Sequence, residues 1–151
     1  MGWGIDSESA FVCAVFWCAY VPWAAWLSWH DLVSRRLPDR LTLPAVPMAA
    51  LFSLHDAAFT AFAAGAAIWA VTYAAVAVVK QGAMGGGDVK LALTLGGVTG
   101  WSAGLPGTLA AMIAAGLLTG ALGLVRRKGA MPHGPSMLLA CAGVALGGPM
   151  E

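Results

Sequence analysis

Charged residues are scarce in this sequence. Asp, Glu, Lys and Arg make up only 10% of the 151 residues, whereas 60% are hydrophobic, and the mean hydropathy is +0.79. About a quarter of the residues in a soluble domain carry charge, so this composition excludes an ordinary soluble protein and indicates a chain surrounded by lipid. The net charge of only +1 excludes the basic surface that nucleic-acid binding requires, and we expect no nucleic-acid partner.

Cysteine is also scarce. Cys13, Cys18 and Cys141 lie in apolar runs, and no CxxC or Cys/His cluster accompanies them. We therefore expect no metal site, no cofactor and no disulfide, and we interpret the cysteines as small packing residues. His30 and His133 are isolated too, and we expect both at the membrane interface. The N-terminal stretch MGWGIDSESA lacks a basic residue, so no cleaved signal peptide is expected.

Long uncharged stretches predict the transmembrane helices. Residues 10–29 and 57–79 are each long enough to cross a bilayer, which takes about 20 helical residues. Residues 91–125 are uncharged as well, but one helix of that length would measure about 52 Å, so we expect the stretch WSAGLPG at 101–107 to break it. We predict one all-α transmembrane domain over residues 1–151. Its six expected helices are residues 10–29, 41–55, 57–79, about 88–101, about 108–125 and 136–150.

Small residues indicate where these helices pack. The stretch GLLTG places Gly116 and Gly120 four positions apart, which is the spacing that lets the backbones of two helices approach closely. We therefore expect a tight helix contact at these two glycines.

The basic residues predict the orientation in the membrane. All of them fall in three segments between the expected helices, and with six helices these segments share one side. The positive-inside rule makes that side cytoplasmic, so both termini are expected to be extracytoplasmic. The residues are Arg35, Arg36, Arg40, Lys80, Lys90, Arg126, Arg127 and Lys128.

Three acids, Asp31, Asp39 and Asp88, lie on the predicted cytoplasmic side. Acids near the hydrocarbon are costly and usually face a polar cavity or a partner. If two carboxylates meet in a site of low dielectric constant, one keeps a proton at a pH where the other has lost it. Such a pair can activate a water molecule and protonate a carbonyl oxygen or a leaving amine, which is the chemistry of an aspartic protease.

Each acid also has a purely structural interpretation. Asp39 follows a proline and can cap the next helix, Asp31 can cap a helix or pair with Arg35, and Asp88 can cap the helix after a simple loop. The residues alone do not choose between Asp31 and Asp39 as the partner of Asp88.

Three consecutive glycines precede Asp88 in KQGAMGGGDVKL. Without a Cβ, Gly85, Gly86 and Gly87 let another backbone come close and can adopt a positive φ. We interpret them, together with Lys90, as the place where a substrate strand lies beside Asp88. Lys90 can instead contact Asp88 or a lipid head group.

The sequence resembles the type IV prepilin peptidases, which are membrane aspartic proteases of the GxGD class. HDLVSRRLPDRLTLP carries Asp31 ahead of a basic stretch, GGGDVKLALTLGG places Gly85, Gly87 and Asp88 on the GxGD positions, and MPHGPSMLLA is similar to the entry to the family's last helix. The resemblance covers about residues 25–145. It implies that Asp31 and Asp88 are the catalytic pair and that Asp39 is a cap.

The resemblance also implies a substrate and a location. Family members reside in the bacterial inner membrane and cut the short basic leader of prepilins or pseudopilins, after a glycine, at the cytoplasmic face. Longer members carry an N-terminal insert with paired cysteines and also methylate the new N-terminus. This sequence has no CxxC pair and only about nine residues ahead of the first expected helix, so we expect a short form without methyltransferase activity. The alternatives are a preflagellin peptidase, a small proton- or cation-coupled transporter, and a structural subunit of a secretion machine.

Overall fold

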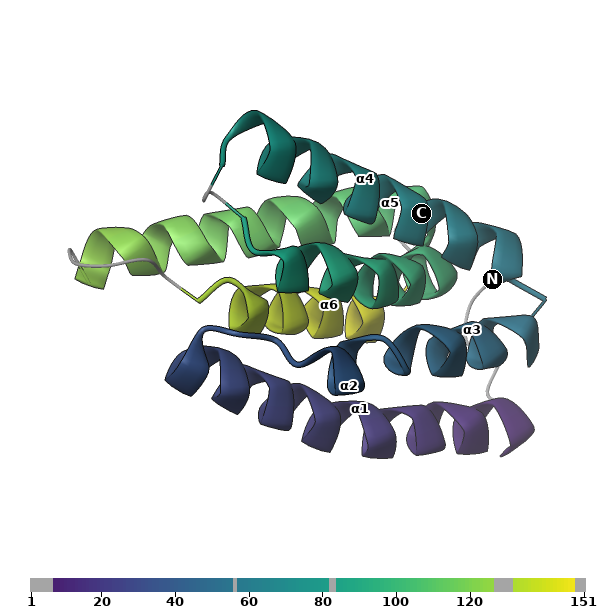
Figure 1. Cartoon of the computed structure of the whole chain (residues 1–151). Coiled ribbons are helices and arrows are strands. Elements are labelled where there is room, and N and C mark those ends of the chain that lie inside the picture. Colours follow the sequence, from purple (N-terminus) through teal and green to yellow (C-terminus); the bar gives the residue numbers. More distant parts are fainter. Residues whose placement is uncertain (1–6, 56, 82–83, 127–131, 149–151) are drawn as a thin grey trace.

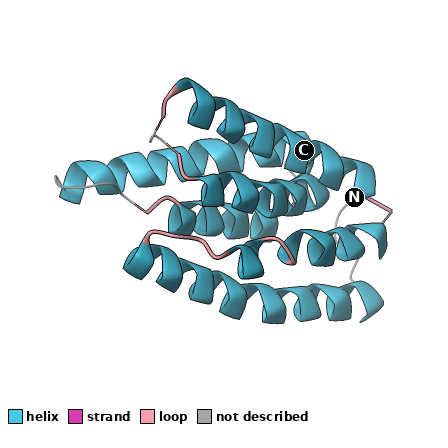
Figure 2. Ribbon diagram, viewed as in Figure 1, coloured by secondary structure: helices cyan, strands magenta, loops and turns pink. Residues whose placement is uncertain are grey.

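The described part of the chain is helical, as the composition predicts. The computed structural model describes residues 7–55, 57–81, 84–126 and 132–148, and no β-strand occurs within these ranges. Figures 1 and 2 show the helices packed roughly along one direction. They are α1 (Ser7–Ser34), α2 (Asp39–Thr42), α3 (Ala45–His55), α4 (Phe59–Val79), α5 (Gly86–Arg126) and α6 (Gly134–Gly147).

Helix α5 contains the break that was predicted within residues 101–107. Gly104 has a φ of 65° and a ψ of −168°, and the two halves of α5 run in opposite directions in Figure 1. Glycine adopts this positive φ without a steric penalty, and Pro106 has no N–H to continue a helix. The hydroxyl oxygens of Thr99 and Thr108 lie 3.2 Å apart across the bend. The reversal brings the start and the end of α5 to the same end of the molecule.

Several helix boundaries differ from the sequence prediction: the single helix expected over 41–55 is divided into α2 and α3, and two further differences bear on the candidate site. Helix α1 continues past residue 29 to Ser34, so Asp31 lies inside it, and it ends where Arg35 has a φ of 51°. Helix α6 begins at Gly134, not at residue 136. Both boundaries matter because they decide how Asp31 and the start of α6 meet.

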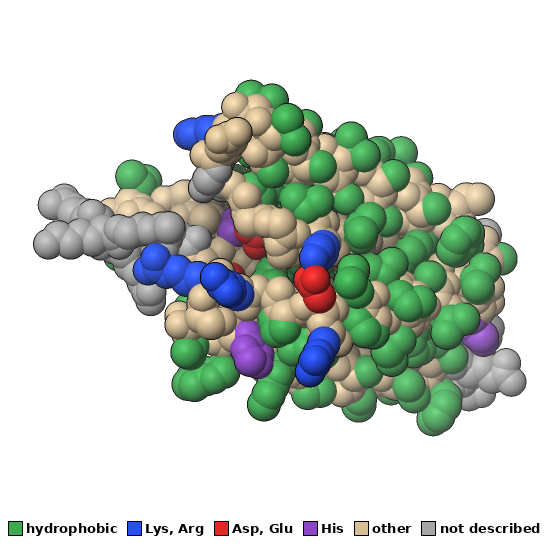
Figure 3. All heavy atoms as spheres, in the orientation of Figure 1, with side chains coloured by type: hydrophobic (Ala, Val, Ile, Leu, Met, Phe, Trp, Pro, Cys, Tyr) green, Lys and Arg blue, Asp and Glu red, His purple; other side chains and the backbone are tan. Residues whose placement is uncertain are grey.

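The helices are apolar enough to cross a membrane. Within the described residues three stretches qualify by length and composition, namely Phe11–Ser34, Phe59–Val79 and Gly86–Val125, whereas Gly134–Gly147 is apolar but shorter. Large hydrophobic side chains cover the outside, with Val79 86% exposed and Leu124 81% exposed, and Figure 3 shows them over most of the visible surface. An apolar exterior of this extent fits contact with lipid. The number of membrane crossings and the side of each terminus stay predictions.

Glycines let α4 and α5 touch backbone to backbone. A Cβ added to Gly65 would lie 2.2 Å from the carbonyl oxygen of Gly96, and one added to Gly100 would lie 2.3 Å from that of Ala61. Small residues four apart permit this approach. The predicted contact at Gly116 and Gly120 was wrong, because a Cβ at either would meet nothing within 4 Å. Both glycine pairs have the required spacing, but only the first half of α5 faces a helix with a matching glycine.

This contact predicts a stability difference between two glycine substitutions. We expect Gly96→Ala to lower the melting temperature of the purified protein, because its Cβ would lie 2.4 Å from the Gly65 carbonyl oxygen, and overpacking costs about 1–3 kcal/mol. Gly116→Ala is the matched control within the same helix, with open space around its Cβ. Equal melting temperatures for the two variants would contradict the contact.

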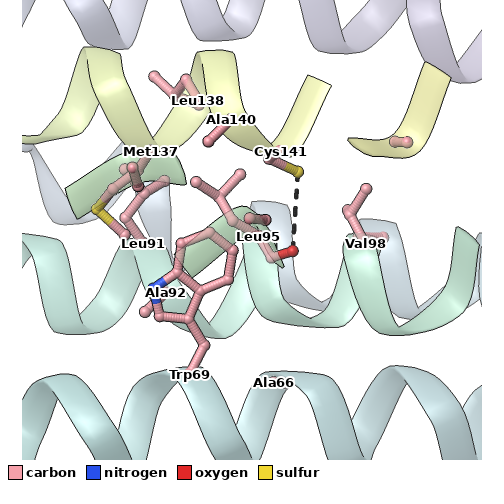
Figure 4. Packing of buried hydrophobic residues seen from close by; sticks show 14 of the residues in the cluster. Ala66, Trp69, Leu91, Ala92, Leu95, Val98, Met137, Leu138, Ala140 and Cys141 are labelled. Atoms are coloured by element: carbon pink, nitrogen blue, oxygen red, sulfur yellow. Dashed lines mark hydrogen bonds between the residues drawn. The ribbon is translucent and has the colours of Figure 1, made fainter. Parts of the chain in front are cut away.

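A buried cluster joins α4, α5 and α6. In Figure 4 the Trp69 side chain of α4 lies beside Leu91 and Leu95 of α5, and Met137 and Cys141 of α6 face the same helix. Cys141 is a free, fully buried thiol whose Sγ lies 3.7 Å from the Leu95 carbonyl oxygen. It therefore acts as a small packing residue, as the sequence predicts. The cluster holds the beginnings of α5 and α6 in a fixed relation.

Candidate active site

Three connections between helices lie at one end of the bundle. In Figure 1 the end of α1, the start of α5 and the start of α6 are all at the left. The space-filling view shows a recess on this side, in which acidic and histidine side chains are visible, with Lys and Arg side chains around it. This end carries both acids that the sequence singles out.

Asp31 is held by the first residue of α6. It lies near the end of α1, is only 6% exposed, and its Oδ2 accepts a hydrogen bond of 2.9 Å from the Gly134 N–H. A Cβ on Gly134 would lie 2.8 Å from that oxygen, so glycine is what allows the close approach. Among the described residues Asp31 makes no ion pair, so the pairing with Arg35 that the sequence left open is not formed.

Asp88 is held by the glycine segment. It is the third residue of α5, and its Oδ2 accepts a hydrogen bond of 3.2 Å from the Gly85 N–H. The side chain thus reaches back to the residue before the helix, which is the second half of a capping box. Asp88 therefore caps α5, as the structural interpretation expected, but only one of its oxygens is used in this way.

The two carboxylates come from distant parts of the chain, since helices α2, α3 and α4 lie between them in the sequence. In Figure 1 the end of α1, which carries Asp31, and the start of α5, which carries Asp88, are nevertheless at the same end of the bundle. In each side chain Oδ2 accepts a backbone N–H, and within residues 7–55, 57–81, 84–126 and 132–148 the Oδ1 atoms have no hydrogen bond. Each acid is thus oriented by one oxygen and has the other available for a reactant.

The three glycines differ in what surrounds them. A Cβ on Gly87 would lie 2.9 Å from the Cβ of Leu37, one on Gly85 would lie 3.3 Å from Asp88 Oδ2, and one on Gly86 would meet nothing within 4 Å. None of the three has a positive φ, so close approach, not backbone freedom, is what requires glycine here. Gly86 is exposed and leaves space for another chain beside Asp88.

Leu37 makes a contact that the sequence did not predict. It is buried in the segment between α1 and α2, and it packs against the backbone at both Gly87 and Gly134. Leu37 therefore lies between the starts of α5 and α6 and fixes the distance between the two segments that orient the acids.

Asp39 and Lys90 form an ion pair that includes neither Asp31 nor Asp88. Lys90 Nζ lies 2.7 and 2.8 Å from the two carboxylate oxygens of Asp39, with side-chain exposures of 39% and 56%. Asp39 is the first residue of α2 but provides no capping interaction, since Pro38 occupies the N-cap position without a side-chain bond. The ion pair joins α2 to α5, and a role for Lys90 in binding substrate stays a prediction.

The exposure of this ion pair predicts a small energetic contribution. We expect Lys90→Gln to change the free energy of unfolding by less than about 1 kcal/mol, because solvent screens charges at the surface. Melting curves at low and high salt check this, since the difference between wild type and variant should shrink as salt rises. A loss of several kcal/mol would show that the pair is more important than its exposure suggests.

His133 is the second feature that sequence reasoning missed. The sequence placed it at the interface as an isolated residue, but its ring lies 2.9 Å from the Tyr73 hydroxyl through Nε2 and 2.6 Å from the Thr119 hydroxyl through Nδ1. Burial lowers the pKa of His133, so the ring is neutral at pH 7. The only signal in the sequence was its position inside MPHGP, directly before Gly134.

No cluster of metal ligands accompanies these residues in the described part of the chain. Within those ranges there is no group of three or more His, Cys, Asp or Glu side chains that could hold a metal ion. The groups that the site offers for chemistry are the two carboxylates, which can act as a proton donor and a proton acceptor toward a water molecule.

Comparisons with known proteins point to one group. Residues 18–120 match the family described as the type IV leader peptidase family. The chain is 33% identical over 126 residues to a prepilin leader peptidase/N-methyltransferase of Aeromonas hydrophila, covering 76% of this chain and 43% of that protein. It is 34% identical over 82 residues to the protein of the same name from Escherichia coli K12, covering 50% and 36%. The chain thus spans less than half the length of these relatives, and no solved structure gives a significant match.

Proposed function

Because the chain belongs to the type IV leader peptidase family, we propose that it is a membrane aspartic endopeptidase that removes the leader of a type IV prepilin or pseudopilin. Asp31 and Asp88 are the catalytic pair in this proposal. The observation that carries it is their arrangement at one end of the bundle, each with one oxygen held by a backbone N–H.

Peptide hydrolysis by this pair follows from acid–base chemistry. One carboxylate accepts a proton from water while the water oxygen bonds to the scissile carbonyl carbon, and the other carboxyl group, still protonated, donates to the carbonyl oxygen. The tetrahedral intermediate then collapses, and the C–N bond breaks as the nitrogen takes up a proton from the pair. The products are a new carboxylate on the leader and a free amine on the mature protein. The two acids titrate as one coupled system, so the roles of base and acid belong to the pair.

The substrate's approach is proposed from the glycine segment. Gly86 is exposed and has space around it, so an extended strand can lie along residues 85–87 beside Asp88. The N-terminal amides of α5 favour partial negative charge nearby, which suits the developing oxyanion of the intermediate. Lys90 follows Gly86 by about one helical turn, so it is the basic residue nearest in sequence to the glycines along which the substrate strand would lie.

The membrane side is proposed from the basic residues. Arg35 and Arg36 follow the end of α1, Lys80 follows the end of α4, and Lys90 lies in the second turn of α5. In Figure 1 these helix ends lie at the end of the bundle that carries Asp31 and Asp88, and the positive-inside rule assigns such an end to the cytoplasm. Cleavage then takes place at the cytoplasmic surface of the inner membrane. The absence of methyltransferase activity stays an expectation from the sequence.

A transporter is the alternative from another class, and the position of the acids disfavours it. Proton- and ion-conducting proteins place acids within the hydrocarbon region along a path. Among the described acids, Asp31 lies near the end of α1, Asp88 lies in the first turn of α5, and Glu8 lies in the first turn of α1. Because none of these acids lies in the middle of a long helix, their positions fit a reaction at the membrane surface.

One experiment tests the proposal directly. The purified protein in detergent is mixed with a pilin that still carries its basic leader, and mass spectrometry of the products identifies the bond that is cut. We expect a single shorter product that begins directly after the last glycine of the leader. A pilin with that glycine replaced by a large residue is the matched control and should stay intact. No product from the unaltered pilin would reject the peptidase assignment.

A further inference from the structure

His133 directly precedes the glycine that holds Asp31. Its ring bonds to the Tyr73 hydroxyl in α4 and to the Thr119 hydroxyl in the second half of α5, so the short segment before α6 is tied to two other helices. Its backbone carbonyl accepts the Met137 N–H at 3.1 Å as α6 begins. Hydrogen bonds therefore hold both the side chain and the main chain of His133, which directly precedes α6.

The residue that follows is the one that holds Asp31. Gly134 donates its N–H to Asp31 Oδ2 at 2.9 Å, and a peptide bond joins it to His133, so a shift of His133 moves this donor. A displacement of about 1 Å in a catalytic group is enough to lower a rate by a factor of about 100. The ring of His133 is thus placed to control the position of Asp31 without touching it.

The other hydrogen-bond partner lies in α4. Tyr73 is buried, and its ring centroid lies 5.5 Å from that of His133. A neutral imidazole has one N–H donor and one acceptor nitrogen, so one of the two hydroxyls donates to the ring and the other accepts from it. The Tyr73 and Thr119 hydroxyls together therefore hold the His133 ring in one orientation.

We propose that His133 is a positioning residue for Asp31: its hydrogen bonds to Tyr73 and Thr119 fix the Gly134 amide against the Asp31 carboxylate. This inference rests on the proposed peptidase function. It predicts that the turnover step depends on the ring nitrogens, whereas substrate binding along the glycine segment does not.

The test compares variants that remove single hydrogen-bonding groups. His133→Phe removes both nitrogens and keeps a ring, Tyr73→Phe removes only one hydroxyl, and Thr119→Val replaces a hydroxyl by a methyl group. Thr119→Ser restores the hydroxyl. Thr72→Val is the matched control, because the Thr72 hydroxyl bonds only to the Ile68 carbonyl on an exposed face of α4.

The readouts are kcat and KM for cleavage of a leader-bearing pilin, and the melting temperature. For His133→Phe we expect kcat to fall about 10- to 100-fold with KM nearly unchanged. Tyr73→Phe and Thr119→Val should each lower kcat less, Thr119→Ser should recover most of the wild-type rate, and Thr72→Val should match wild type. The double variant His133→Phe/Tyr73→Phe should have about the same kcat as His133→Phe alone, because both substitutions remove the same hydrogen bond.

The outcomes separate this inference from the proposed function. An active wild type together with an unchanged kcat in His133→Phe would overturn the positioning role and leave the peptidase assignment intact. A wild type that cleaves no leader would overturn the peptidase assignment itself. A fall in kcat that only follows the loss in melting temperature, with no recovery in Thr119→Ser, would reduce His133 to a structural residue and also reject the inference.

Discussion

We expect Asp31→Asn and Asp88→Asn each to abolish detectable cleavage of a leader-bearing pilin while the protein still inserts and folds. Asparagine has the size of aspartate but neither takes up nor releases a proton at neutral pH, so the activation of water is lost, and we expect the rate to fall by a factor of about 10² to 10⁴. In Asp31→Asn the side-chain amide oxygen can still accept the Gly134 N–H that Asp31 accepts at 2.9 Å, which protects the fold. Gel mobility of a co-expressed pilin, followed by kinetics on the purified protein, measures the loss.

Two controls make this result specific. Asp39→Asn removes the third acid on the same side, whose carboxylate is 56% exposed and bound to Lys90, and we expect it to retain cleavage. The double variant of Asp31 and Asp88 should be no slower than either single variant, because residues that act as one unit do not lose activity additively. Full activity in either single variant would remove that residue from the catalytic pair.

Gly134→Ala is the second substitution with a large expected effect, although it changes no ionisable group. The new Cβ would lie 2.8 Å from Asp31 Oδ2 and 3.4 Å from its Cγ, so the carboxylate or the start of α6 must move and the hydrogen bond between them is lost. We expect kcat to fall about 100-fold, with a smaller loss of stability. Steady-state kinetics and a melting curve on the same preparation separate the two effects.

The matched control for Gly134→Ala is in the same helix. A Cβ on Gly143 would meet nothing within 4 Å, so Gly143→Ala should keep full activity and gain a little stability from the higher helix propensity of alanine. If Gly134→Ala were as active as Gly143→Ala, the close approach between Gly134 and Asp31 would have no functional importance.

Local sequence signals predicted the features that depend on a few neighbouring residues. The break in α5 was expected because WSAGLPG combines glycine and proline, and the structure places it at Gly104. The helical class followed from the long uncharged runs. The fit of Asp88 to the start of a helix followed from the glycines before it, and the structure places Asp88 within the first turn of α5.

Contacts between distant segments were not predicted, because they depend on how the helices face each other. The hydrogen bond between Gly134 and Asp31 spans 103 positions, and the bond between Tyr73 and His133 spans 60. No periodicity or spacing encodes such pairs. The glycine spacing at Gly116 and Gly120 shows the same limit, since it marks a surface that can accept a helix but does not say whether one is present.

The backbone contact between α4 and α5 has a consequence for motion within the bundle. Glycine-to-carbonyl contacts at Gly65, Gly96 and Gly100 leave no layer of side chains that could repack as one helix slides along the other. Asp88 therefore belongs to a stiff unit, whereas Asp31 is carried by a separate helix that meets the start of α6 through the Gly134 hydrogen bond and the packing of Leu37. If a bound chain draws the two carboxyl groups together, we expect α1 to be the helix that moves and the α4–α5 unit to stay fixed.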